Sequence, residues 1–149
     1  MAGAAPSYTV LVVEDNPDIV VSLQDLLTHD GYTVHTADSC AGGFAQLRAH
    51  RFNAVLLDVT LPDGDGLEML ATIQQLDPHL PVIVVTASTR TEKTVGSLTR
   101  GAFAYLTKPY HREELRQTLR RAIGVKELAV KAQRAEHLLT ESEDRFRSL

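Results

Sequence analysis

The chain has 149 residues, of which 44% are hydrophobic and 23% are charged. It is long enough for one well-buried core and short for two domains, so one domain with an appendage is expected. The formal net charge of -4, without a run rich in Lys or Arg, argues against nucleic-acid binding by this segment. Cys40 is the only cysteine, which excludes an intramolecular disulfide and a cysteine-based zinc site.

The N-terminal residues show no targeting signal. Residues 1–7 lack the basic and then apolar pattern of a secretory signal, and we interpret them as a disordered leader. No apolar run approaches the roughly 20 residues that a membrane helix needs. We therefore expect a cytoplasmic location and no membrane contact by this segment.

Residues 9–29 predict a strand followed by a helix. Residues 9–13 are an apolar run, typical of a strand covered on both faces, and the run ends in Glu14 and Asp15. Asn16 can cap a helix that has Pro17 at its first position. Until Gly31 ends the pattern, apolar residues fall on one face of this helix: Ile19, Leu23, Leu26 and Leu27.

A second strand and helix are predicted next. Residues 32–37 are rich in β-branched and aromatic residues, as strands are. Asp38 or Ser39 can cap the following helix. Two apolar residues anchor that helix and two glycines weaken it: Phe44, Leu47, Gly42 and Gly43.

The central apolar run, residues 54–58, predicts a buried strand that ends on a single carboxylate, Asp58. The proline and glycines of residues 60–66 predict a loop. A third helix is marked by Leu67, Leu70 and Ile73.

Residues 82–87 predict a fourth strand, which ends near the hydroxyl of Thr86. Residues 91–100 predict a polar helix with only Val95 and Leu98 as apolar anchors, and so little buried area favours a mobile element. Residues 104–107 predict a fifth, shorter strand.

The fifth strand ends in Lys108 and Pro109, and a last helix follows, on which Leu115, Leu119 and Ile123 lie four residues apart. Five strands thus alternate with five helices. This alternation predicts an α/β fold, a doubly wound parallel sheet with helices on both faces.

Polar residues stand where the apolar runs end: Glu14, Asp15, Asp58, Thr86 and Lys108. The ends of parallel strands share one edge of the sheet, so these residues should converge. Each pair of carboxylates about 4 Å apart repels by roughly 4 kcal/mol at an effective dielectric constant near 20, which a bound cation would relieve. Oxygen ligands beside a phosphoryl group suit Mg²⁺. A lysine and a hydroxyl facing Asp58 would bind the oxygens of a phosphoryl group carried on it.

In these motifs, and in their order at the strand ends, residues 8–124 resemble a response-regulator receiver domain of two-component signalling. The motifs are Glu14-Asp15, Asp58 with Leu61-Pro62-Asp63-Gly64 after it, Thr86-Ala87 and Lys108-Pro109. The resemblance implies a flavodoxin-like sheet with strand order 2-1-3-4-5. It also implies a phosphoacceptor with self-catalysed phosphotransfer and hydrolysis rather than an enzyme, and a histidine kinase or histidine phosphotransfer protein as its partner.

The resemblance also implies a role for each site residue. Asp58 would be the phosphoacceptor and, with Asp15, a Mg²⁺ ligand, while Glu14 would act through water and Thr60 through its backbone carbonyl. Lys108 would pair with the phosphoryl group. Thr86, Ala87 and Tyr105 would form the phosphate-binding and switching group, which alters the face made by the fourth helix, fifth strand and fifth helix. Pro109 is the candidate for a cis peptide bond.

Simpler interpretations of these residues remain open. Asp58 alone could be a cap or loop residue, Tyr105 an ordinary half-buried aromatic and Lys108 a surface charge, and Gly64 and Gly66 are taken as turn residues. Among other functions, a haloacid-dehalogenase-like phosphatase would need a second Asp at the position of Thr60. A flavodoxin-like flavin binder conflicts with the acidic cleft, and a phosphorylation-independent dimerisation scaffold is the alternative to a phosphoacceptor.

Residues 125–149 predict a helical extension that continues the last helix across Gly124. Its acidic and basic residues cancel, five against five. Alternating spacings of three and four predict a coiled-coil dimer seam; its positions are Val125, Leu128, Ala132, Ala135, Leu139, Ser142, Phe146 and Leu149. The alternative is a single amphipathic helix folded back on the domain, or a partly disordered tail.

Residues 141–149 resemble the segment that leads into a PAS sensory domain. This resemblance implies a linker toward a downstream PAS domain, with a histidine-kinase core or a cyclase as the output. His137 does not fit a kinase phosphohistidine, because Leu138 follows it where that motif has an acid.

Overall fold

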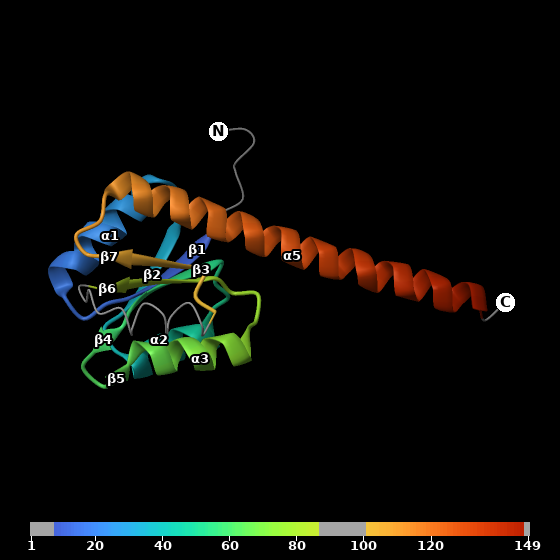
Figure 1. The fold of residues 1–149 in the computed structure, drawn as a ribbon, viewed down its shortest axis with the longest axis horizontal. Coiled ribbons are helices and arrows are strands. Elements are labelled where there is room, and N and C mark those ends of the chain that lie inside the picture. Colours follow the sequence, from blue (N-terminus) through green and yellow to red (C-terminus); the bar gives the residue numbers. More distant parts are fainter. Residues whose placement is uncertain (1–7, 87–100, 148–149) are drawn as a thin grey trace.

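The computed structural model describes residues 8–86 and 101–147, and a five-stranded parallel sheet is their central element (Figure 1). Its strands lie in the order β2-β1-β3-β6-β7, which is 2-1-3-4-5 for the five strands of the parallel sheet. The predicted fold class is therefore confirmed. The strands are β1 (Thr9–Val13), β2 (Thr33–Ala37), β3 (Ala54–Asp58), β6 (Val82–Thr86) and β7 (Ala104–Thr107).

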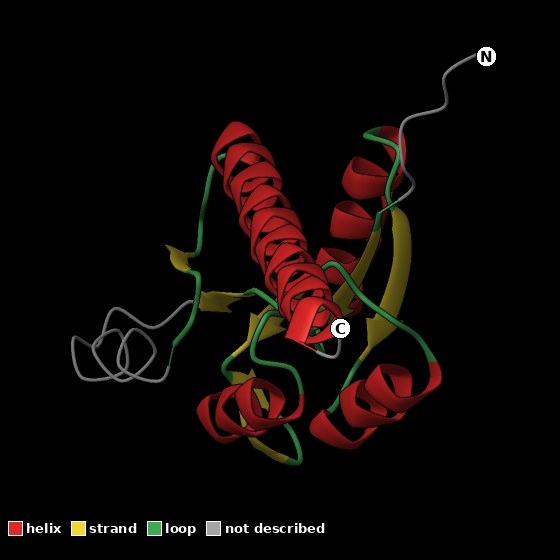
Figure 2. Cartoon of the chain, turned by 90° about the vertical axis from the view of Figure 1, so that its right-hand side faces the viewer, coloured by secondary structure: helices red, strands yellow, loops and turns green. Residues whose placement is uncertain are grey.

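Helices cover both faces of this sheet (Figure 2). Helices α1 (Pro17–His29) and α5 (Arg112–Arg147) pack on one face, and α2 (Cys40–Ala49) and α3 (Gly66–Leu76) pack on the other. The expected helix at residues 91–100 lies outside the described residues.

Burial on both faces explains the continuous apolar runs in the sequence. In β1, Val10 and Val12 face the layer of α1 and α5, while Leu11 and Val13 face the layer of α2 and α3. All five residues of β3 are buried. Such a strand has no solvent-facing side, so its sequence shows no polar alternation.

The predicted helix caps are present at α1 and α2. The Asn16 side chain accepts a hydrogen bond from the Asp18 backbone N–H at 3.0 Å, and Pro17 is the first residue of α1. Of the two candidates at α2, Ser39 is the cap, accepting a hydrogen bond from the Gly42 N–H at 3.0 Å. These side chains satisfy backbone N–H groups that have no partner within the helix.

Gly43 lets α2 pack closely against its neighbours. A Cβ atom at this buried glycine would lie 2.5 Å from Met69 Cε of α3 and 3.3 Å from Val13 Cγ2 of β1. The glycine that lowers the intrinsic helix propensity of α2 thus allows the helix to lie close to the Met69 and Val13 side chains.

Residues 60–66 were expected to form a loop, and this prediction is wrong in part. Strands β4 (Thr60–Leu61) and β5 (Gly64–Asp65) form a short antiparallel hairpin within that range. Thr60 is paired with Asp65, and Leu61 with Gly64. Pro62 and Asp63 lie at the turn and favour a loop. The flanking strands have only two residues each, which is too short for a strand pattern to be recognised in the sequence.

Helix α5 is continuous over 36 residues, including Gly124, and extends well beyond the sheet (Figure 1). At about 1.5 Å per residue its length is about 54 Å. The predicted long C-terminal helix is therefore confirmed. In the described part of the chain, no helix combines the length and the apolar character needed to cross a membrane.

Candidate functional site

Three carboxylates meet at the C-terminal edge of the sheet. Glu14 and Asp15 follow β1, and Asp58 ends β3, the strand paired directly with β1. Each of the three offers an oxygen atom, and these atoms all lie within 4.8 Å of one another. Glu14 and Asp58 are buried, whereas Asp15 is exposed. The convergence expected from strand ends in a parallel sheet is thus present.

Lys108 places a positive charge against two of these acids. It follows β7, and its Nζ donates hydrogen bonds to Glu14 Oε1 at 2.5 Å and to Asp58 Oδ2 at 3.3 Å. Burial alone would lower the pKa of Lys108, but the hydrogen bonds and charges of Glu14 and Asp58 outweigh it and raise the pKa. Lys108 is therefore held as an ammonium group. The peptide bond between Lys108 and Pro109 is cis.

Glu14 shows that negative charge is crowded here. Burial, and then the hydrogen bond and charge of Asp58, raise the pKa of Glu14, although Lys108 and the Asn16 backbone N–H act in the opposite direction. One ammonium group does not offset the desolvation and mutual repulsion of the acids. A divalent cation would relieve both, and carboxylate oxygens are the ligands that Mg²⁺ prefers.

Two residues of the hairpin region, Asp63 and Gly66, hold the backbone around Asp58. The Asp63 carboxylate accepts hydrogen bonds from the backbone N–H groups of Cys40 at 2.7 Å and Ala41 at 3.0 Å, at the start of α2. These hydrogen bonds lower the pKa of Asp63, and the one from Ala41 has the larger effect. Gly66 donates its N–H to the Val59 carbonyl at 3.0 Å, and a Cβ there would lie 2.5 Å from the Asp58 carbonyl oxygen.

These two positioning roles were not predicted from the sequence. The sequence predicts only a turn residue at Gly66, yet this position requires glycine because the N-terminus of α3 lies against the backbone of the Asp58 strand end. The partners of Asp63 precede it by 22 and 23 residues. To predict this contact, one would need to know that α2 starts at Cys40 and that the hairpin places Asp63 beside that start. The sequence indicates the first of these but not the second.

Three further predicted site residues lie in strands near this edge of the sheet or in the adjoining hairpin. Thr86 ends β6, whose residue Val85 is in register with Asp58. Thr60 begins β4, two residues after Asp58. Tyr105 lies half-buried in β7 and packs on the core layer of α2 and α3. Ala87 lies outside the described residues.

Comparison with known proteins agrees with this geometry. Residues 10–120 match the family model described as the response regulator receiver domain. The chain belongs to this family. As a receiver domain, it has the phosphoacceptor role of two-component signalling. Receiver domains bind Mg²⁺ at an acidic site, and Glu14, Asp15 and Asp58 form an acidic cluster here.

Two curated relatives illustrate the sequence similarity of this receiver domain. It is 38% identical over 117 residues to the probable transcriptional regulatory protein TcrX of Mycobacterium tuberculosis, covering 76% of this chain and 50% of that protein. It is also 38% identical over 115 residues to the transcriptional regulatory protein ZraR of Escherichia coli K12, covering 77% of this chain and 26% of that protein. The receiver chain thus spans half or less of the length of these relatives.

Two solved structures show the same fold. The CheY-like receiver domain protein of Methanospirillum hungatei JF-1 is 32% identical, with a TM-score of 0.80, covering 83% of this chain and 98% of that one. The receiver domain of an HD domain-containing protein from Pseudomonas fluorescens Pf-5 is 26% identical, with a TM-score of 0.81, covering 88% and 97%.

Proposed function

We propose that Asp58 is the phosphorylated residue and that it accepts the phosphoryl group from a phosphohistidine of a histidine kinase or phosphotransfer protein. The observation that supports this assignment best is the position of Asp58, at a strand end close to two further acids and to the ammonium group of Lys108. A carboxylate so placed is near both a candidate cation site and a positive charge that can bind phosphoryl oxygens.

The proposed cation is Mg²⁺. Glu14, Asp15 and Asp58 would hold it, together with the backbone carbonyl of Thr60, and their crowded carboxylates fit such an ion. When bound, Mg²⁺ supplies charge neutralisation for the incoming phosphoryl oxygens.

Asp58 and Lys108 have different roles in the proposed phosphoryl transfer. An Asp58 carboxylate oxygen attacks phosphorus, the bond from phosphorus to the donor nitrogen breaks, and the imidazole leaves and takes up a proton. Lys108 stays beside Asp58 and pairs with a phosphoryl oxygen, since its ammonium group already contacts that carboxylate. Such transfer depends on position and charge more than on a protein base.

The test of this proposal is mass spectrometry of the intact protein. Incubation with Mg²⁺ and acetyl phosphate should add one phosphoryl group, and Asp58→Asn should abolish the addition. Asp25→Asn, an exposed acid on α1, is the matched control and should leave it unchanged. Phosphorylation of the Asp58→Asn variant to the wild-type level would refute the assignment.

For the output, we propose that phosphorylation acts through a switching group and the long helix. Thr86 would turn toward the phosphoryl group and Tyr105 inward, which would change the face formed by the expected helix at 91–100, β7 and the first turns of α5. This change would pass along α5 to a downstream domain, for which a PAS domain followed by a kinase core is our first candidate. We place the protein in the cytoplasm, as the soluble receiver family suggests.

We further propose that two copies dimerise along the extension of α5. Leu115, Leu119 and Ile123 face the sheet and are buried, whereas Val125 and Leu128, farther along α5, are 53% and 68% exposed. Apolar residues left exposed where the helix leaves the domain are suited to packing against a second helix.

Sedimentation with and without beryllofluoride, a mimic of the aspartyl phosphate, tests the switching of this dimer. A changed monomer–dimer equilibrium supports a phosphorylation-controlled dimer. The alternative function, a phosphorylation-independent scaffold, is favoured by the same exposed stripe and predicts an unchanged dimer in both conditions.

A further inference from the structure

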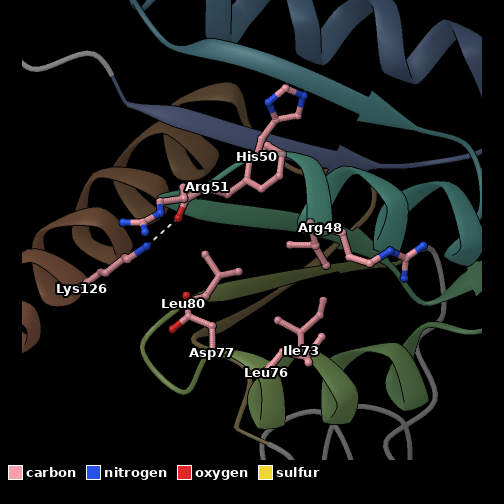
Figure 3. A pocket seen from close by; sticks show the side chains of 10 residues that line it. Arg48, His50, Arg51, Ile73, Leu76, Asp77, Leu80 and Lys126 are labelled. Atoms are coloured by element: carbon pink, nitrogen blue, oxygen red, sulfur yellow. Dashed lines mark hydrogen bonds between the residues drawn. The ribbon is translucent and has the colours of Figure 1, made fainter.

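A pocket of about 420 Å³ lies beside the N-terminal end of β3, at the opposite edge of the sheet from the acidic site. It is formed by the segment that joins α2 to β3, by the end of α3 with the loop after it, and by α5 (Figure 3). Its volume falls in the range of small-molecule sites. The phosphoacceptor residues take no part in it.

Apolar side chains from α3 and from the segments before β3 and after α3 line the pocket. Phe52, Ile73 and Leu80 are almost fully buried and form part of the wall, and Leu76 lies at the surface with 67% of its area exposed. The Phe52 ring packs edge-on against the imidazoles of His35 and His50, at centroid distances of 5.6 and 6.2 Å. An apolar body therefore has a preformed surface to contact.

Cations outnumber acids around this apolar surface. Arg48, Arg51 and Lys126 line the pocket, and Asp77 is the one acid among the lining residues. In the described part of the chain, neither arginine forms an ion pair. The pocket thus combines an apolar wall with net positive charge.

Arg51 and Lys126 come together at one end of the pocket (Figure 3). Lys126 Nζ donates to the Phe52 carbonyl at 2.5 Å, which is a neutral partner. Burial lowers the pKa of Lys126; the charge of Asp77 opposes this in part, and the charge of Arg51 adds to it. Two neighbouring cations at the end of an apolar pocket would be stabilised by an anionic group between them.

We propose that this pocket binds a small organic anion, with its carboxylate, sulfonate or phosphate group between Arg51 and Lys126 and its apolar body against Phe52, Ile73 and Leu80. Arg51 supplies planar N–H donors and Lys126 supplies an ammonium group, so together they can bind at least two oxygens. Because Lys126 belongs to α5, the bound anion contacts the output helix directly. This site is independent of phosphorylation at Asp58.

The test uses the full chain and the fluorescent probe 8-anilinonaphthalene-1-sulfonate, an aromatic body that carries one anionic group. Titration should show one saturable site. Arg51→Gln and Lys126→Gln should each weaken binding about tenfold, equivalent to ~1.4 kcal/mol. Lys131→Gln, an exposed lysine farther along the same helix, is the charge-matched control and should bind as the wild type does.

Two further comparisons separate this pocket from a general apolar surface. Leu76→Glu should weaken binding at least as strongly as the cation variants, whereas Val21→Glu, which changes another exposed aliphatic residue, this one on α1, should not. Octanoate should displace the probe at concentrations where octanol does not. Unchanged affinity in both cation variants, loss of binding in Val21→Glu instead, or equal displacement by octanol would each overturn the proposal.

Discussion

Lys108 Nζ lies 2.5 Å from Glu14 Oε1, closer than its 3.3 Å distance to Asp58 Oδ2. The ammonium group is thus held mainly by the acid that follows β1 while it still contacts the proposed phosphoacceptor. Glu14 positions the charge that Asp58 uses.

Replacement of Lys108 by Gln should slow phosphorylation by acetyl phosphate about 100-fold, because it removes one charged donor from the developing phosphoryl charge. The initial rate of phosphoryl addition measured by intact mass checks this. Lys131→Gln is the control and should keep the wild-type rate. Equal rates for Lys108→Gln and the wild type would mean that Lys108 plays no part in the transfer.

Without divalent cations, the free energy of unfolding should fall as the pH rises from about 4.5, the ordinary pKa of Glu14, through its raised pKa in the folded state. The folded protein binds a proton at Glu14 more tightly than the unfolded chain, so stability is highest with Glu14 protonated and is lost as it ionises. Urea unfolding at several pH values in EDTA measures this slope.

Glu14→Gln should flatten that slope, and Mg²⁺ should recover stability at neutral pH in the wild type and less so in the variant. Glu68→Gln, an exposed acid on α3, is the control and should leave the slope as it is. A slope that persists in Glu14→Gln would assign the pH dependence to another group.

Gly66→Ala should lower the free energy of unfolding by about 1–3 kcal/mol. Its new Cβ would lie 2.5 Å from both the Asp58 carbonyl oxygen and Val59 Cα, which are backbone atoms that cannot turn aside. Gly124→Ala, in α5 with no atom within 4 Å of the added Cβ, should instead stabilise by about 0.5–1 kcal/mol. Denaturant unfolding of both variants measures the contrast.

Asp63→Ala should loosen the start of α2. The amides of Cys40 and Ala41 would lose their shared acceptor, so their hydrogen exchange should become faster, while Asp38→Asn, an exposed neighbour, should not change it. Because the pKa of Asp63 is lowered from 3.8, this contact is intact above that pH and is lost as the pH falls through the folded-state pKa. Exchange rates that do not respond to Asp63→Ala would show that Asp63 does not hold the two amides that follow the Ser39 cap.

Val125→Gln with Leu128→Gln should convert the proposed dimer into a monomer with little change in the unfolding of the domain, since both side chains are largely exposed in the single chain. Sedimentation and thermal unfolding measure the two effects. Val21→Gln, an exposed residue on α1, is the control and should leave the association state unchanged.

The sequence by itself determined the order of the strands along the chain and the acids and the lysine at their ends. Strands buried on both faces have unbroken apolar sequences, so the ends of the strands can be identified from the sequence alone. The polar residues at these ends are Glu14, Asp15, Asp58 and Lys108. The cap Asn16, and Ser39 as one of two candidates with Asp38, were predictable for a similar reason, because a cap acts within a few residues of its own helix.

Only the tertiary structure decided the contacts between distant segments. Three features join residues that no local pattern connects: the hydrogen bond from the Cys40 N–H to Asp63, the close packing at Gly43 and Gly66, and the proximity of Arg51 to Lys126. Such contacts depend on how closely packed elements approach one another, and the distances of approach are set by the whole core rather than by the residues nearby in sequence.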